Sequence, residues 1–589
     1  MPRMPVMEAA VKILESEGVE YIFGIPGGSI NPFYKALSKS NKIKHLTFRS
    51  ELGMTNAADG YARASGKVGV TACIGGPGGA VAVASIYSAF TDSVPLVCIN
   101  GDIPSKLRGE EGTTSISLNE LCEPVAKKTY WVKSGNQLPM VFREAFRIAR
   151  EGRPGPVVIE IPVDVQQQEI VYEPELDAPL EVTVPKPNMK KIEKAIDMLL
   201  KAEKPVILLG GGAVSADACD ELVELAEYLA IPVIPTIMGK GGILPDHPLY
   251  AGQAGTRISI PPGNEIYLES EVVLAVGVRF GDRHTGDKDV YTGNRKFIHI
   301  DIEPTQIGRT IPVDLGIVSD AKLALQAMLK AAKKKTLRRE PSPRVKKIPE
   351  MRKKMARKDD FDNVPLYPQR VFREMNEFFD EDTAYVTTIG LVQMLSGQFQ
   401  KVYKPKRYFI NSGFGCLGWD LPASLGIKIA RPDLTVVDVV GDFGVTYSTN
   451  QLAVASQYGV PIIVAIIDDG YLGLIRQNQE LAYGFHYGVD IVYNRLAPRL
   501  TDFVKLAEAY GIAGERVALP EEIKPSLERA LKATKDERPY LIDFITESVD
   551  VSTGLRIDKI TERGYRVNPI PPAKVDLEIP PISRVVEEK

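Results

Sequence analysis

Short, continuously apolar runs recur along the chain, and segments with a helical pattern separate them. Several of these runs end in Gly, Pro or Asp, which is typical of strands in a parallel sheet that is buried on both faces. Helices between successive runs indicate repeated βαβ units, so the pattern predicts an α/β fold. The predicted strands are residues 19–26, 68–75, 95–101, 156–162, 205–212, 232–238, 271–277, 296–302, 435–442, 461–469 and 539–546.

Two segments of different composition interrupt this pattern. Residues 173–191 are rich in Pro, and residues 330–360 carry a dense run of Lys and Arg that we interpret as a solvated helical linker. We therefore predict three doubly wound parallel-sheet domains, at residues 1–175, 190–330 and 362–547. Residues 548–589 are Pro-rich and poorly periodic, and we expect this tail to wrap the surface.

Composition narrows the class of protein. The chain has 589 residues, with 44% apolar and 25% charged residues and a net charge of −3. These values are typical of a globular protein and argue against nucleic acid as a partner. The N-terminus is typical of an amphipathic helix rather than a signal peptide, and no apolar run reaches the roughly 18 residues that span a bilayer. Five scattered Cys without a CxxC pair favour reduced thiols in a cytoplasmic enzyme without a membrane partner.

The strongest chemical signal lies near the C-terminus. A predicted strand ends at Gly441-Asp442, and the next one ends at Asp468-Asp469-Gly470. Carboxylates at the C-terminal ends of parallel strands face one crevice, where α/β folds bind ligands. We expect Asp442 and Asp469 to bind Mg²⁺ together with a carbonyl of the adjoining turn, at Tyr471, and the metal to anchor a diphosphate. Each Asp alone would more often be a turn or cap residue.

Further segments carry a resemblance to a known superfamily. They are residues 22–37, 48–70, 75–104, 205–216, 276–287 and 299–309, together with GDF at 441–443 and DDG at 468–470. The chain resembles the acetohydroxyacid synthase-like enzymes that depend on thiamine diphosphate, whose motif reads GDG and then NN. The resemblance implies a pyrimidine-binding domain, a central FAD-type domain and a diphosphate-binding domain. It also implies thiamine diphosphate, Mg²⁺ and a structural FAD as cofactors.

The resemblance assigns roles to individual residues. Glu51 falls on the catalytic glutamate that bonds N1′ of the aminopyrimidine; otherwise it would be a surface or capping residue. The GxGxxG at 413–418 becomes part of the thiamine pocket rather than an NAD site. Predicted cofactor-binding residues are Pro26, Gly27, Gly78, Gly390, Leu391, Gly415, Leu417, Gly441, Gly444 and Gly473, with Gly211, Gly212, Arg279, Arg283, Asp301 and Asp320 for the FAD. The predicted substrate pocket comprises Ser50, Thr113, Thr114, Leu472, Ile475 and Asn478.

Within this superfamily the chain is similar to the glyoxylate carboligases, above all at residues 361–376, 385–393, 410–419 and 470–479. That similarity implies condensation of two glyoxylates to tartronate semialdehyde with release of CO₂. Asn478 stands where acetohydroxyacid synthases carry a Trp that favours longer acceptors. Glu51, however, departs from the glyoxylate carboligases, which have Val. Ser50 and Thr113-Thr114 replace the His and the Phe-Gln pair of related enzymes.

Two alternatives stay open. One is an acetolactate-synthase-like carboligase or 2-oxo-acid decarboxylase that acts on pyruvate or another small 2-oxo acid. The other is a catalytically silent homologue that binds FAD and thiamine. Because the superfamily places one cofactor between domains of different subunits, we expect a homodimer as the minimal active unit and a homotetramer as the assembly.

Overall fold

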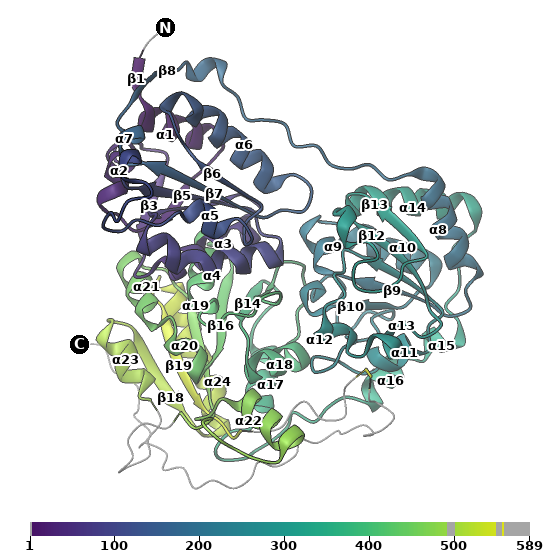
Figure 1. Cartoon of the computed structure of the whole chain (residues 1–589). Helices are drawn as coiled ribbons and strands as arrows, with labels where there is room; N and C mark the ends of the chain where they lie inside the picture. Colours follow the sequence, from purple (N-terminus) through teal and green to yellow (C-terminus); the bar gives the residue numbers. More distant parts are fainter. Residues whose placement is uncertain (1–2, 492–500, 549–556, 559–589) are drawn as a thin grey trace.

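The computed structural model describes residues 3–491, 501–548 and 557–558. It contains three parallel sheets, each flanked by helices (Figure 1). The N-terminal sheet lies above the C-terminal sheet in that view, and the middle sheet lies to their right. Among the described residues, none of the helices combines the length and apolar character that a membrane span requires.

The N-terminal sheet has six strands in the order β3-β2-β4-β5-β7-β6. Its strands are β2 (Tyr21–Gly24), β3 (Lys44–Thr47), β4 (Gly69–Ile74), β5 (Leu96–Asp102), β6 (Lys128–Trp131) and β7 (Pro156–Pro162). Its helices are α1 (Val6–Ser16), α2 (Asn31–Leu37), α3 (Glu51–Ser65), α4 (Pro77–Asp92), α5 (Leu118–Cys122), α6 (Leu138–Arg150) and α7 (Val163–Gln166). A separate antiparallel pair joins β1 (Arg3–Pro5) to β8 (Glu169–Val171).

The middle sheet has five strands in the order β10-β9-β11-β12-β13. They are β9 (Pro205–Leu209), β10 (Val233–Pro235), β11 (Val272–Val276), β12 (Lys296–Asp301) and β13 (Leu315–Val318). Its helices are α8 (Met189–Lys201), α9 (Gly211–Ser215), α10 (Cys219–Leu229), α11 (Gly263–Leu268), α12 (Asp282–Thr285), α13 (Lys288–Thr292) and α14 (Ala321–Lys335). Two short helices, α15 (Pro343–Lys346) and α16 (Ile348–Lys354), follow in the basic linker.

The C-terminal sheet has six strands in the order β15-β14-β16-β17-β19-β18. They are β14 (Thr383–Thr387), β15 (Tyr408–Ile410), β16 (Thr435–Gly441), β17 (Ile463–Asp468), β18 (Ala513–Val517) and β19 (Tyr540–Ile545). Its helices are α17 (Pro368–Phe378), α18 (Leu391–Phe399), α19 (Asp420–Ala430), α20 (Asp442–Thr446), α21 (Leu452–Tyr458), α22 (Gly473–Asn478), α23 (Phe503–Ala509) and α24 (Pro520–Lys535).

The parallel α/β architecture predicted from the sequence is confirmed. All eleven predicted strands overlap observed ones: β2, β4, β5, β7, β9, β10, β11, β12, β16, β17 and β19. The basic linker is partly helical, yet Val345 and Ile348 are buried in the core of the middle domain, so this segment is less solvated than expected. Most of the predicted tail lies outside the described residues; of its described part, Ile557 is buried and donates its backbone N–H to Gly255 O over 3.0 Å.

Helices α3 and α19 join the N-terminal sheet to the C-terminal one. A Cβ at Gly60 of α3 would collide with the Ala423 carbonyl, and a Cβ at Gly426 of α19 would collide with the Ala57 carbonyl. The two glycines therefore let the helix backbones approach closely. The contact buries residues of both sheets in one continuous hydrophobic core.

Candidate active site

Glu51 is the first residue of α3, and its neighbour Ser50 caps that helix. Ser50 Oγ accepts the backbone N–H of Gly53 over 3.1 Å, which satisfies one of the free donors at the helix start. The Glu51 carboxylate lies on Gly78 of α4, where an added Cβ would be 2.9 Å from Glu51 Oε1. The structure thus brings the predicted catalytic and cofactor residues Glu51 and Gly78 together.

The other predicted residues of this domain lie at the C-terminal ends of β2 and β4. Gly27 packs against Ile74, which also borders Gly78, and the Pro26 side chain is exposed. A side chain at Gly76 would collide with the Thr114 carbonyl, so the loop that carries Thr113 and Thr114 crosses the same turn. Both threonines are exposed.

Three buried carboxylates meet where β16 and β17 end. Asp442 Oδ2 and Asp468 Oδ1 both accept the backbone N–H of Gly470, over 2.9 and 3.2 Å. Asp469 Oδ1 accepts the N–H of Tyr471 over 3.1 Å. The predicted pair Asp442 and Asp469 is therefore held by short turns at adjacent strand ends, and Asp468 adds a third acidic group.

The electrostatics of this cluster fit a divalent cation. Burial, together with the charge of Asp469, raises the pKa of Asp442 well above its usual range, and burial together with Asp442 does the same for the pKa of Asp468. Burial raises the pKa of Asp469 to about 6. A hard cation would supply the missing positive charge, since Mg²⁺ prefers oxygen ligands. Among the described residues, no three Asp, Glu, His or Cys side chains are placed to hold a metal ion together, so carbonyl and diphosphate oxygens would have to join Asp442 and Asp469 as ligands.

The remaining predicted diphosphate-side residues surround this cluster. A Cβ at Gly473 would lie 2.6 Å from Asp469 Oδ2 and 3.0 Å from Leu391, so glycine lets the carboxylate lie close to the start of α22. Gly390 has a φ of +141° at the start of α18, a conformation that favours glycine. These open, glycine-lined positions fit a phosphate-bearing cofactor. Gly441 lies near Val392, Gly444 near Leu417, and Gly415 near Ile389.

Helix α22 follows directly and presents the predicted pocket residues Leu472, Ile475 and Asn478. Ile475 is 51% exposed, while Leu472 and Asn478 are half-buried. The buried Tyr471 ring stacks under the Arg476 guanidinium, with 4.1 Å from Cζ to the ring centroid. This contact fixes the start of α22 beside the carboxylates.

The predicted flavin residues follow the C-terminal ends of strands in the middle sheet. Gly211 and Gly212 follow β9, and Asp301 ends β12, with β11 between these two strands in the sheet. Asp320 follows β13 and caps α14 by accepting the N–H of Leu323 over 2.9 Å. Flavin binding remains a prediction.

The two arginines in the flavin prediction make contacts with the other two domains. Arg279 contacts Asp92 of the N-terminal domain, and Arg283 Nη1 donates to Gln393 of α18 over 2.9 Å. Both side chains therefore link domains in this structure.

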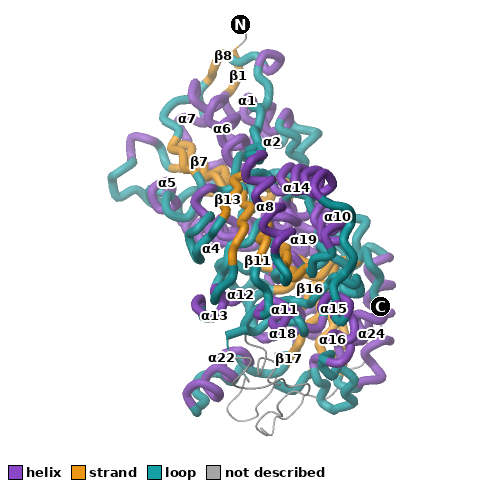
Figure 2. Tube along the Cα trace, turned by 90° about the vertical axis from the view of Figure 1, so that its right-hand side faces the viewer, coloured by secondary structure: helices purple, strands orange, loops and turns teal. Residues whose placement is uncertain are grey.

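The two halves of the predicted site lie on different domains of the chain, because Glu51 begins α3 and Asp442 begins α20. In Figures 1 and 2 alike, the N-terminal sheet with β7 lies at the top and α22 at the bottom. Within the described residues, no hydrogen bond or ion pair joins Glu51 to Asp442 or Asp469.

Comparison with known proteins agrees with this arrangement. Family models of thiamine pyrophosphate (diphosphate) enzymes match the N-terminal TPP binding domain at residues 4–121, the central domain at 192–328 and the C-terminal TPP binding domain at 388–544. Fold and site together define an enzyme that depends on thiamine diphosphate, of the carboligase and decarboxylase class. The chain belongs to the thiamine pyrophosphate enzyme family.

Individual relatives cover nearly the whole chain. It is 41% identical over 574 residues to the glyoxylate carboligase of Escherichia coli O157:H7, an overlap of 95% of this chain and 96% of the relative. It is 36% identical over 549 residues to the acetolactate synthase large subunit of Corynebacterium glutamicum, covering 92% and 87%. It is 33% identical over 549 residues to the acetolactate synthase isozyme 3 large subunit of Escherichia coli K12, covering 92% and 94%.

Some residues around the site escaped the sequence analysis. Gln451 Nε2 donates to Ser50 Oγ, and Glu160 accepts the N–H groups of Leu118 and Asn119 behind the Thr113-Thr114 loop. These partners are far apart in sequence, so no local motif marks them.

Proposed function

We propose that the protein condenses two glyoxylates to tartronate semialdehyde with release of CO₂. Two glyoxylate anions and one proton give one tartronate semialdehyde anion and one CO₂, so the reaction consumes no oxidant or reductant. The observation that carries the proposal is the 41% identity to a glyoxylate carboligase over almost the full length of both chains. Asn478 at the end of α22, in place of the bulky Trp, supports a small 2-oxo acid as substrate.

Thiamine diphosphate, when bound, supplies a thiazolium ring that accepts the electron pair left by the departing CO₂. The side chains of the protein would move protons and orient the reactants. Glu51 would hold a proton between its carboxylate and N1′ of the aminopyrimidine, as a positioned acid–base group. Ser50, Thr113 and Thr114 would face the substrate from the N-terminal side, and Leu472, Ile475 and Asn478 from the other.

Asp442, Asp469 and the Tyr471 carbonyl would hold Mg²⁺. The metal would neutralise the buried carboxylates and bind the diphosphate oxygens, which leaves the glycines at 390, 415 and 473 to line the cofactor. The raised pKa values of Asp442 and Asp469 support this assignment, because a cation at the cluster offsets the cost of their burial.

Glu51 and the carboxylate cluster lie on different domains, which suits a site shared between two copies of the chain, as the resemblance implies. We propose a homodimer as the minimal active unit and a homotetramer as the assembly. Val81 of α4 and Phe414 are 49% and 48% exposed, as side chains covered by a second copy would be. We also propose that the protein is cytoplasmic, because all five cysteines are free thiols, which suits a reducing compartment.

The second candidate is an acetolactate-synthase-like activity on pyruvate. Glu51 favours it, since glyoxylate carboligases lack this glutamate, and the acetolactate synthase relatives at 36% and 33% identity agree with it. The deciding experiment offers glyoxylate, pyruvate and 2-oxobutyrate separately, with thiamine diphosphate, Mg²⁺ and FAD. Tartronate semialdehyde from glyoxylate supports the proposal. Acetolactate from pyruvate without turnover of glyoxylate contradicts it.

A further inference from the structure

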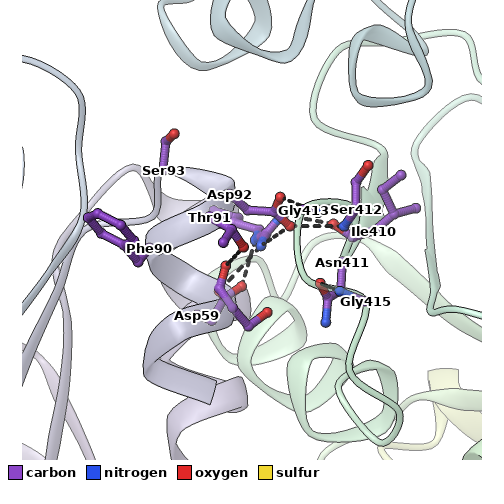
Figure 3. Close-up of polar contacts among 12 residues, drawn as sticks. Asp59, Phe90, Thr91, Asp92, Ser93, Ile410, Asn411, Ser412, Gly413 and Gly415 are labelled. Atoms are coloured by element: carbon purple, nitrogen blue, oxygen red, sulfur yellow. Dashed lines mark hydrogen bonds and ion pairs between the residues drawn. The ribbon is translucent and has the colours of Figure 1, made fainter. Parts of the chain in front are cut away.

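Asp92, the last residue of α4, lies where all three domains meet (Figure 3). Its side chain is fully buried and receives four hydrogen bonds. Oδ1 accepts the backbone N–H of Gly413 over 2.8 Å and Arg279 Nη2 over 3.2 Å. Oδ2 accepts the backbone N–H of Ser412 over 3.0 Å and Arg63 Nη2 over 3.1 Å. A carboxylate has about four acceptor sites, so this one is saturated.

The backbone groups that Asp92 binds open the 411–418 loop, which joins β15 to α19. Within the loop, Asn411 Oδ1 accepts the N–H of Gly415 over 3.0 Å. At its far end, Asn56 of α3 donates to the Gly418 carbonyl over 3.3 Å. The N-terminal domain therefore holds this loop at both ends, and the stronger, charged contact is at its start.

Gly413 packs closely against Asp92 and Thr91. A Cβ at Gly413 would lie 2.7 Å from Asp92 Oδ1 and 2.7 Å from the Thr91 side chain. Any side chain at Gly413 would push the loop away from the carboxylate. The position of the loop therefore depends on the position of the Asp92 carboxylate.

We propose that Asp92 is a positioning residue for the cofactor: by fixing Ser412 and Gly413, its carboxylate sets the 411–418 loop in the conformation that binds thiamine diphosphate. Asp92 itself touches no reacting atom. The inference rests on the proposed function, because Gly415 and Leu417 of this loop are the residues expected to contact the cofactor. It adds that the N-terminal domain builds this part of the C-terminal binding surface within the same chain.

Asp59 provides a matched control. It is buried, it is on the neighbouring helix α3, and it accepts the same arginine, with Arg63 Nε at 2.6 Å from Asp59 Oδ1. In the described structure, Asp59 accepts no hydrogen bond from a backbone group of the loop. Asp59→Asn therefore weakens the same ion-pair network as Asp92→Asn but leaves the loop anchor in place.

The experiment measures thiamine diphosphate binding by calorimetry in the full-length protein with Mg²⁺, and hydrogen exchange of the peptide spanning the loop. An Asn at position 92 offers one acceptor oxygen and points donors at an N–H group. We expect Asp92→Asn to weaken binding by about tenfold or more and to speed exchange of the loop. Asp59→Asn should stay within about twofold of the wild type in both measurements.

A second variant covers the case in which Asp92→Asn fails to fold. Gly413→Ala keeps every charge and displaces the loop, so it should weaken binding and speed exchange in the same direction. Equal effects of the variants at Asp92 and Asp59, or unchanged binding in Gly413→Ala, would overturn the inference. A wild-type protein that does not bind thiamine diphosphate would instead overturn the proposed function, while the exchange comparison would still test the anchor.

Discussion

Gln451 Nε2 donates a hydrogen bond to Ser50 Oγ over 3.0 Å, and so reaches from the C-terminal domain to the cap of α3. Gln451 Oε1 also accepts the backbone N–H of Arg49 over 3.4 Å. The residue just before Glu51 is thus fixed by a side chain four hundred residues away in sequence. The position of the predicted proton-transferring carboxylate depends on contact between the two domains.

Replacing Gln451 by Leu should loosen this position without removing Glu51. The variant keeps the side-chain volume, loses the bonds to Ser50 and Arg49, and should cost about 1 kcal/mol of folding stability. We expect slower exchange of the thiazolium C2 proton at nearly unchanged cofactor affinity. Exchange followed by NMR, with calorimetry alongside, checks this; wild-type exchange rates would show that the contact does not position Glu51.

Glu51→Gln tests the catalytic carboxylate directly. The amide keeps the shape of the side chain but cannot exchange a proton with N1′, so C2 exchange in the bound cofactor should slow by at least about tenfold. The measurement compares C2 exchange in native and variant protein by NMR. Equal rates would mean that Glu51 is not the partner of N1′.

Asp442→Ala tests the metal assignment. Without this carboxylate the diphosphate loses its Mg²⁺ bridge, and we expect binding that depends on Mg²⁺ to be abolished. Asp438→Asn is the matched control, because Asp438 is a buried acid of β16, the strand that ends just before Asp442, and its charged neighbour is Asp420. Calorimetric titration with thiamine diphosphate, in the presence and absence of Mg²⁺, measures the cofactor affinity of both variants. Undiminished affinity in Asp442→Ala would contradict the assignment.

Asp420 and Asp438 themselves predict a pH dependence of stability. Burial raises the pKa of Asp420 to about 7, and burial with the charge of Asp420 raises the pKa of Asp438 well above its usual range. The folded protein therefore binds more protons here than the unfolded chain. This contribution to stability is present below about pH 4, the usual range of an Asp, and is lost as the pH rises toward 7.

Asp438→Asn removes one of the two charges that must be buried at high pH. Neither carboxylate oxygen of Asp438 has a hydrogen-bond partner among the described residues, so little is lost by the substitution. We expect the Tm of the cofactor-free protein to rise by roughly 2–4 °C at pH 8 and to change little at pH 5. Thermal unfolding at the two pH values measures this. A loss of stability at pH 8 would contradict the prediction.

The buried strands could be predicted because their signal is local. Runs such as residues 435–442 and 461–469 are apolar on both faces, and only a central parallel strand needs that pattern. Central strand β14 (TAYVT) was missed because its apolar run is short and follows the polar Asp380–Asp382. The edge strands β3, β6, β13, β15 and β18 were missed. β3, β6 and β18 carry polar residues, which an edge strand tolerates, and β13 and β15 are only 4 and 3 residues long.

The site residues, too, could be predicted only where their signal is local. Glu51 and Asp442 lie in motifs read along one strand or turn, whereas Gln451 and Asp92 act through contacts with residues several hundred positions away. An Asp before Ser-Val-Pro is typical of an ordinary turn, and only the fold shows which backbone it binds. The structure also gives Arg279 and Arg283 partners in other domains, which no local pattern indicates.

The contact between α3 and α19 has a symmetry of its own. Both helices join the second strand of a sheet to the third, and the N-terminal and C-terminal sheets share one strand order. Each helix carries an Ala and, three residues later, a Gly: Gly60 meets Ala423, and Ala57 meets Gly426. Such reciprocal pairing defines a twofold axis between identical subunits. Here the axis relates two parts of one polypeptide, which is the arrangement that duplication and fusion of an ancestral self-pairing domain would leave.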